Sequence, residues 1–177
     1  MIHKTISYLF YFAYSFGVTY ATYYTSSLCH ELGHLGVFRY IIGGKIYRCI
    51  IGLPNLINID YSIGSFTFKS GEGPKIYLCR FEFPNDNSSI TQLRLILMYL
   101  GGPVSGLVSI IIIKYLTDVK MLNFIIITEV IDNLWSGNPN CDGSEILKIL
   151  RFKTTTFAHS NLLIVCLFAV NLLFIGI

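Results

Sequence analysis

The chain has 177 residues, of which 53% are hydrophobic and only 13% are charged, and its net charge is +3. A soluble domain is typically about 45–50% apolar and about 25% charged, so this composition argues against a water-soluble surface. The mean hydropathy of +0.60 points the same way. The small and dispersed positive charge argues against a nucleic-acid partner. We therefore expect a single membrane-embedded domain over residues 1–177.

Four apolar stretches follow one another along the chain, and we interpret each as a membrane helix. They run approximately over Ile6–Ile42, Leu93–Leu116, Val119–Trp135 and Phe157–Ile177. A bilayer core of about 30 Å needs about 20 helical residues. The second and fourth stretches meet this length, the third is short, and the first is so long that it must project or bend. Gly43 and Gly44 are the expected stop of the first helix.

The segment of about residues 45–90 has a different character. Its short runs are rich in Ile, Tyr and Phe and are separated by Gly and Pro, which predicts strands and hairpins. The runs are Ile46–Ile51, Ile57–Tyr61, Ser65–Lys69 and Lys75–Phe83. The predicted fold class is therefore all-α integral membrane, with about four transmembrane helices and a small β-hairpin-rich insert between helices 1 and 2. The core covers about residues 6–150, and an extra C-terminal helix covers about residues 157–177.

The cysteines show no pairing pattern. The five are Cys29, Cys49, Cys79, Cys141 and Cys166, and none belongs to a C-x-x-C motif. An odd number at wide spacing argues against a disulfide framework. We expect unpaired thiols that act as small apolar side chains.

Positive charge suggests how the chain is oriented. Most Lys and Arg residues follow the first and third apolar stretches, among them Arg39, Lys45, Arg94 and Lys148. Cytoplasmic loops carry an excess of Lys and Arg. We therefore expect the N-terminus outside and the proposed metal-binding regions near the cytoplasmic face.

The strongest chemical signal is the sequence His30-Glu31-Leu32-Gly33-His34. Residues four apart share one face of a helix, so His30 and His34 can bind one zinc ion. Glu31 can then act as general base toward a metal-bound water. Ionisable residues in an apolar stretch are costly and usually functional, which favours a metal site over a plain polar turn.

A catalytic zinc ion normally has three protein ligands. The first choice for the third is Asp142, in a polar, helix-breaking stretch that follows the third apolar stretch. Glu129, Asp132 and His159 are the competing ligands, and Glu129 and Asp132 can alternatively line a polar cavity around the metal. The Gly101–Gly106 segment is interpreted as a close-packing face between helices.

Taken together, these segments resemble the site-2 protease family of intramembrane zinc metalloproteases, as a minimal bacterial-type core. The resemblance rests on His30–His34, on Gly101–Gly106 and on the Asn133–Gly143 segment, in this order, with the strand-rich insert between the first two. It implies that His30, His34 and Asp142 are the zinc ligands, that Glu31 is the general base, and that Asn133 contacts substrate. The chain departs from the family pattern at Ser136, where proline is usual.

The resemblance implies an enzyme, a zinc metalloendopeptidase that cleaves a peptide bond within or next to a transmembrane segment. Its partners would be a membrane protein or peptide substrate and the lipid bilayer, and its location a bacterial cell membrane. Two alternatives remain. One is a non-catalytic membrane scaffold or binding protein that keeps the zinc site. The other is a prenyl-protein type of membrane zinc endopeptidase, which uses a glutamate as its third ligand.

Overall fold

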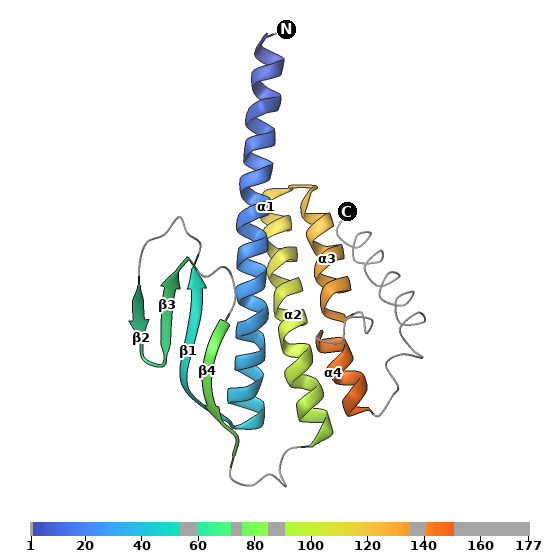
Figure 1. The fold of residues 1–177 in the computed structure, drawn as a ribbon. Coiled ribbons are helices and arrows are strands. Elements are labelled where there is room, and N and C mark those ends of the chain that lie inside the picture. Colours follow the sequence, from blue (N-terminus) through green and yellow to red (C-terminus); the bar gives the residue numbers. More distant parts are fainter. Residues whose placement is uncertain (1, 54–59, 72–75, 85–90, 135–140, 151–177) are drawn as a thin grey trace.

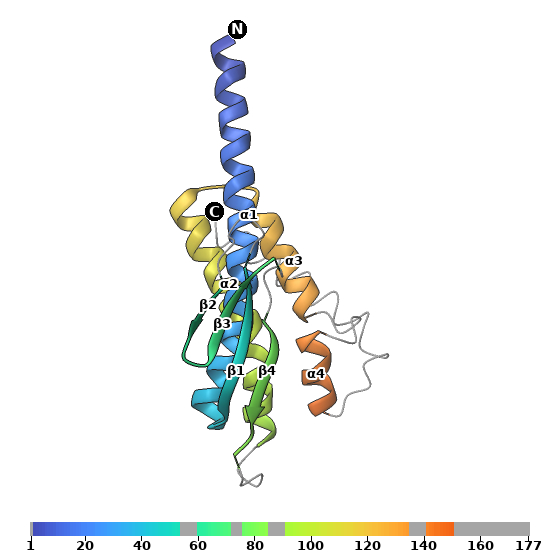
Figure 2. The ribbon, with the colours of Figure 1, turned by 60° about the vertical axis from the view of Figure 1, so that its left-hand side comes forward.

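The structure, a computed structural model, describes residues 2–53, 60–71, 76–84, 91–134 and 141–150. Its elements are α1 (Ile2–Val37), η1 (Phe38–Ile42), β1 (Lys45–Leu53), β2 (Tyr61–Ile63), β3 (Phe66–Ser70), β4 (Ile76–Glu82), α2 (Gln92–Thr117), α3 (Leu122–Leu134) and α4 (Asp142–Ile149). Figure 1 shows α1 beside α2, with the sheet on one side of α1 and with α3 and α4 on the other side of the helix pair. Figure 2 shows α4 continuing the line of α3 after a break.

The first helix ends where the sequence predicts. After the 36 residues of α1 the chain makes one wider π-helical turn over Phe38–Ile42. Gly43 then adopts a left-handed conformation with φ of 81°, which glycine allows without a steric penalty. The ring of Phe38 lies so close to Gly44 that a Cβ there would be 2.2 Å from it. The predicted helix stop at Gly43 and Gly44 is therefore confirmed.

The insert forms a four-stranded mixed sheet in the order β2-β3-β1-β4. β1 pairs in parallel with β3 and antiparallel with β4, and β2 pairs antiparallel with β3. β4 is thus an outer strand. The hydroxyl of Tyr24 on α1 donates a hydrogen bond to the carbonyl of Gly52 on β1, which ties the sheet to the helix.

The predicted strands lie in the right segment but not all in the predicted places. β1, β3 and β4 cover most of three predicted runs. The Ile57–Tyr61 run lies mostly outside the described residues, and β2 begins only at Tyr61.

The fold-class prediction of an all-α membrane protein with about four spans is wrong. The structure combines four α-helices with a mixed sheet, and among the described residues only Gln92–Thr117 is long and apolar enough to cross a membrane. α3 has 13 residues, about 20 Å at 1.5 Å per residue, too short for a core of about 30 Å. α1 is long enough, but Tyr, Ser, Thr and the ionisable residues of its C-terminal half lower its hydropathy. The predicted C-terminal helix lies outside the described residues.

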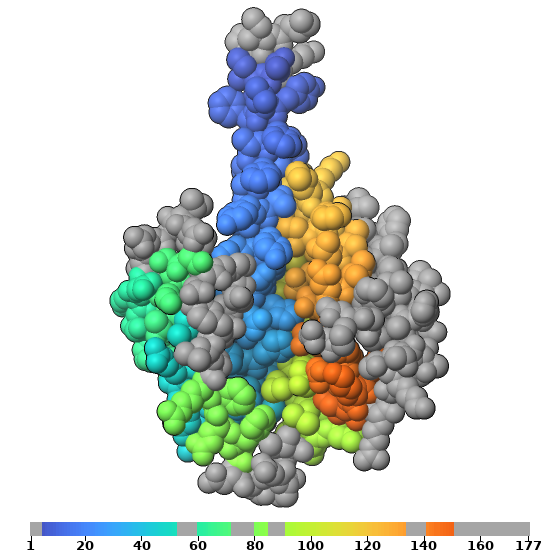
Figure 3. Space-filling view, in the orientation of Figure 1, coloured from blue at the N-terminus to red at the C-terminus, as the bar shows by residue number. Residues whose placement is uncertain are grey.

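Large apolar side chains are nevertheless exposed along much of α1. In its N-terminal half they include Tyr8, Leu9, Phe10, Phe12 and Phe16, each more than half exposed. Figure 3 shows this part of α1 standing clear of the other elements. A contiguous exposed apolar surface is typical of a membrane or protein contact.

A cluster of buried hydrophobic residues lies between α2 and α3. Its members are buried aliphatic residues from both helices and their connection: Leu107, Ile110, Val119, Leu122, Ile125, Ile126 and Val130. This core fixes α3 against α2 and so positions the side chains of α3 that face α1.

The expectation of unpaired cysteines is wrong at one position. Cys49 on β1 is disulfide-bonded. Cys29 and Cys141 are not part of a disulfide, and Cys141 is buried.

Candidate metal centre

The two histidines of the predicted motif lie one turn apart on α1 and face the same point. The Nε2 atoms of His30 and His34 are 3.1 Å apart. Their ring planes are nearly perpendicular, at 79°, with centroids 4.8 Å apart. The spacing of four residues on one helix produces this arrangement, as the sequence predicts.

Asp142 meets the two histidines from a distant part of the chain. It is the first residue of α4, where Cys141 is the N-cap. Its Oδ2 atom lies 3.2 Å from His30 Nε2 and 3.4 Å from His34 Nε2. The side chains of His30, His34 and Asp142 are only 11%, 21% and 15% exposed. The three residues therefore form a His-His-Asp group that could hold a metal ion.

Hydrogen bonds on the far side of each ring determine which nitrogen faces this group. His34 Nδ1 donates to the carbonyl oxygen of Met98 on α2 at 2.7 Å. His30 Nδ1 lies 3.2 Å from Glu129 Oε1 on α3, and this carboxylate oxygen accepts a hydrogen bond from it. A neutral imidazole that donates from Nδ1 has a lone pair on Nε2. Metal-binding histidines are typically oriented by such outer hydrogen bonds.

The convergence of these groups is suited to a cation. Two imidazole Nε2 atoms and a carboxylate oxygen lie within 3.1–3.4 Å of one another, and either a shared proton or a metal ion between them relieves the repulsion of their lone pairs. Ligands at 2.0–2.2 Å in a tetrahedral metal site are about 3.3–3.6 Å apart, so the three atoms lie close to the spacing that one shared metal ion requires. His30, His34 and Asp142 thus fit a metal ion in both charge and size.

Asp142 is suited to act as an anionic ligand. Burial by itself raises the pKa of its carboxyl group, but the hydrogen bonds and charge of His30 and His34 outweigh burial and lower the pKa below its ordinary value. Asp142 is therefore ionised at neutral pH. Its place at the start of α4 adds the favourable interaction of an anion with a helix N-terminus.

Glycines on α2 leave room for the centre. A Cβ atom on Gly102 would lie 2.3 Å from His34 Nε2 and 2.8 Å from His30 Nε2. It would therefore stand next to the space in which a shared metal ion must lie. A Cβ on Gly106 would lie 2.4 Å from Glu129 Oε1, and one on Gly33 would lie 2.1 Å from the Gly101 carbonyl oxygen.

The sequence predicts a close-packing face at Gly101–Gly106. It does not reveal that Gly102 borders the His-His-Asp group. The signal was available, because Gly102 and Gly106 are four apart in an apolar helix. That spacing places both on one face of α2, toward α1 and α3.

The structure also places the other predicted site residues. Glu31 lies on α1 between the histidines and lines a pocket together with His34. Glu129 orients His30 from outside the group, Asp132 is exposed, and His159 lies outside the described residues. Asn133, predicted to contact substrate, donates its side-chain amide to the Glu129 carbonyl at 2.8 Å.

We predict that Glu129→Ala lowers zinc affinity about 10- to 100-fold, the usual cost of removing an outer hydrogen bond to a metal-bound histidine. Glu129→Gln keeps an acceptor for His30 Nδ1 and should lose less. Zinc affinity of the full chain and the visible spectrum of the Co²⁺ form are the measurements. A retained tetrahedral Co²⁺ spectrum at reduced affinity fits a positioning role, whereas unchanged affinity in Glu129→Ala contradicts it.

Comparison of the chain with protein-family models, with curated proteins and with solved structures finds no match in any of the three. The described part of the chain therefore defines its own class: paired helices with a mixed sheet, and a His-His-Asp group that could hold a metal ion.

Proposed function

We propose that this protein is a zinc metalloendopeptidase that cleaves a peptide bond within or next to a membrane-spanning segment of its substrate. One observation carries the proposal: His30 Nε2, His34 Nε2 and Asp142 Oδ2 converge within 3.1–3.4 Å, with Glu31 in the same turn of α1 as the histidines. Three protein ligands and a neighbouring glutamate are the donor set of a hydrolytic zinc site.

The residues divide the chemical work among them. A bound zinc ion lowers the pKa of water to about 7 and polarises a carbonyl group. His30, His34 and Asp142 would hold the ion, and Met98 and Glu129 orient the two imidazoles. Glu31 takes a proton from the attacking water at its carboxylate and later delivers that proton to the leaving amine.

Features outside the centre support a membrane substrate. Gln92–Thr117 has the length and composition of a membrane span, and α1, packed along it, exposes large apolar side chains. Arg39, Lys45 and Arg94 belong to the end of the molecule where α1 finishes and α2 begins (Figure 1), which favours a cytoplasmic location for that end. His30 and His34 lie in the last turns of α1, toward this end.

The sheet offers a way to hold the substrate in the extended form that cleavage needs. A helical segment hides its backbone groups in internal hydrogen bonds, so it must unwind first. β4 is an outer strand of the sheet, and residues at its end line the same pocket as Glu31. Such an edge can pair with an extended peptide by β-augmentation.

The test is cleavage of a panel of transmembrane reporters by the wild type and by Glu31→Gln. We expect the variant to bind zinc as the wild type does and to lose about 10²–10⁴-fold in rate, the usual contribution of a general base. Equal activity in both proteins, or no cleavage of any reporter by the wild type, would count against the peptidase and favour a non-catalytic scaffold.

A further inference from the structure

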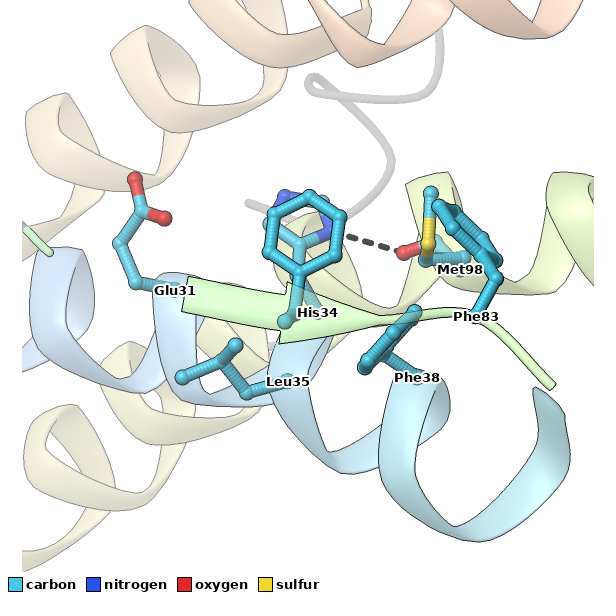
Figure 4. Close-up of a pocket in the computed structure, with 7 residues that line it drawn as sticks. Glu31, His34, Leu35, Phe38, Phe83 and Met98 are labelled. Atoms are coloured by element: carbon cyan, nitrogen blue, oxygen red, sulfur yellow. Dashed lines mark hydrogen bonds between the residues drawn. The ribbon is translucent and has the colours of Figure 1, made fainter. Parts of the chain in front are cut away.

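A pocket of about 250 Å³ adjoins the metal centre. Glu31 and His34 line it from α1, and the rest of its lining is apolar: Leu35, Phe38, Phe81, Phe83 and Met98. His34 is shared between this pocket and the His-His-Asp group. Figure 4 shows His34 held by Met98 on one side, with Glu31, Leu35 and Phe38 along the helix beside it. We call this space the aromatic pocket.

Three phenylalanine rings from two elements form the wall of the aromatic pocket. Phe38 of η1 contacts Phe81 of β4 and Phe83 just beyond it, with ring centroids 5.3 and 5.2 Å apart, and those two rings are 5.8 Å apart. All three contacts are edge-to-face, a favoured geometry for aromatic pairs. The wall is therefore preformed rather than assembled by a ligand.

The wall leaves apolar surface uncovered. Phe38 is 5% exposed, but Phe81 is 51% exposed and Phe83 is 39% exposed. Covering this surface with an apolar group is favourable at about 25 cal/mol per Å². An ionised group in the same place would lose hydration with no Lys or Arg in the lining to compensate, and Glu31 would repel a carboxylate.

The size of the aromatic pocket limits what it can hold. Sites for whole small-molecule ligands are about 300–1,000 Å³, and about 250 Å³ is below that range. One large side chain fits this volume better than a complete ligand does.

We propose that the aromatic pocket binds the side chain of the substrate residue next to the cleaved bond, and that it selects a large apolar side chain such as Leu, Met or Phe. This inference rests on the peptidase function proposed above. A pocket beside the metal centre can receive a side chain next to the cleaved bond only if the substrate bound at that centre is a peptide. The substrate class is thus a segment with a bulky apolar residue beside its cleavage site.

The test uses hydroxamate probes, which bind a zinc ion directly and carry one side chain beside it. The probes bear methyl, isobutyl, benzyl or carboxymethyl groups, and their affinity for the zinc-loaded full chain is measured by calorimetry. We expect isobutyl and benzyl to bind about 10- to 60-fold more tightly than methyl, since each buried methylene contributes a factor of about four. Carboxymethyl should bind more weakly than methyl.

Two variants separate the aromatic pocket from general effects. Phe83→Ala, at a partly exposed position after β4, should reduce the preference for isobutyl over methyl to less than about fivefold. Phe124→Ala is the matched control, because Phe124 is 71% exposed on α3 and does not line the pocket. It should leave the preference unchanged.

The two proposals fail in different ways. If all hydroxamates bind equally well, the metal centre stands and the aromatic pocket is not a side-chain site. The aromatic pocket is also excluded as a side-chain site if Phe83→Ala and a second pocket variant, Leu35→Ala, both still bind the isobutyl probe more tightly than the methyl probe by the wild-type factor. If no hydroxamate binds the zinc-loaded chain, the peptidase proposal itself is overturned.

Discussion

Replacing Asp142 by alanine is expected to lower zinc affinity by about 10²–10³-fold and to abolish hydrolysis. Asp142 supplies one of three converging donor atoms and the only carboxylate among them. Zinc sites with four protein ligands have apparent binding free energies of about 10–16 kcal/mol. An equal share is about 2.5–4 kcal/mol per ligand, and each 1.4 kcal/mol is a factor of ten. The affinity is measured by competition with a chromogenic chelator on the full chain.

Asp132→Ala is the matched control for this experiment. Asp132 is an exposed aspartate on α3, and no role at the centre is assigned to it. Its variant should bind zinc as the wild type does. Equal losses in both variants would mean that general charge, not ligation, determines the affinity. A larger loss for Glu129→Ala than for Asp142→Ala would make Glu129 the third ligand and favour the prenyl-protein type of site.

The parts of the centre that the sequence predicts are those defined by local spacing. His30 and His34 meet because they are four residues apart on one helix, and no tertiary information is needed to see it. Asp142 was selected by resemblance and by its place after an apolar stretch, and the structure brings it within 3.2 Å of His30. This position agrees with that prediction, and the role of Asp142 as a ligand stays a prediction. The position depends on packing between α2 and α4 that the sequence does not display.

The parts that the sequence leaves open depend on contacts across the fold. The sequence names Glu129 and Asp132 alike as competing ligands or as the lining of a polar cavity around the metal. Only the fold shows that Glu129 contacts His30, 99 positions away, whereas Asp132 is exposed. Gly102 matters because of what lies opposite it on α1, which a search for small residues in one helix cannot show.

The error in fold class has a similar origin. Apolar composition was used to count membrane helices, but the 13 residues of α3 are too few to span a bilayer, and the polar residues of α1 lower its hydropathy. The order of residue types within a short run predicts structure better here than the composition of the whole chain does. The run Lys75–Phe83 predicts a strand, and β4 occupies Ile76–Glu82.

Gly102→Ala is expected to lower zinc affinity by more than about 10³-fold while leaving the fold intact. The new methyl carbon would lie 2.3 Å from His34 Nε2 and 2.8 Å from His30 Nε2. A zinc ion lies about 2.0–2.1 Å from each of its histidine nitrogens, so methyl and metal compete for one space. His34 can avoid the methyl only by rotating away and breaking its 2.7 Å bond to the Met98 carbonyl. Alanine itself favours a helix by about 0.5–1 kcal/mol over glycine.

Gly36→Ala is the control for this experiment. It tests whether the lower zinc affinity of Gly102→Ala comes from a methyl group at the metal centre or from replacing any glycine in these helices. Gly36 lies on α1 two residues after His34, and a Cβ there meets nothing within 4 Å. Both variants are compared in zinc affinity and in thermal unfolding with a chelator present. We expect Gly36→Ala to bind zinc as the wild type does and to unfold at or above the wild-type temperature. Gly102→Ala should still unfold cooperatively, at a temperature lowered by the loss of the His34–Met98 hydrogen bond and raised in part by the helix preference of alanine. Zinc affinity of Gly102→Ala within about threefold of the wild type would place the ion away from the shared face of His30 and His34, and the His-His-Asp centre would then be wrong.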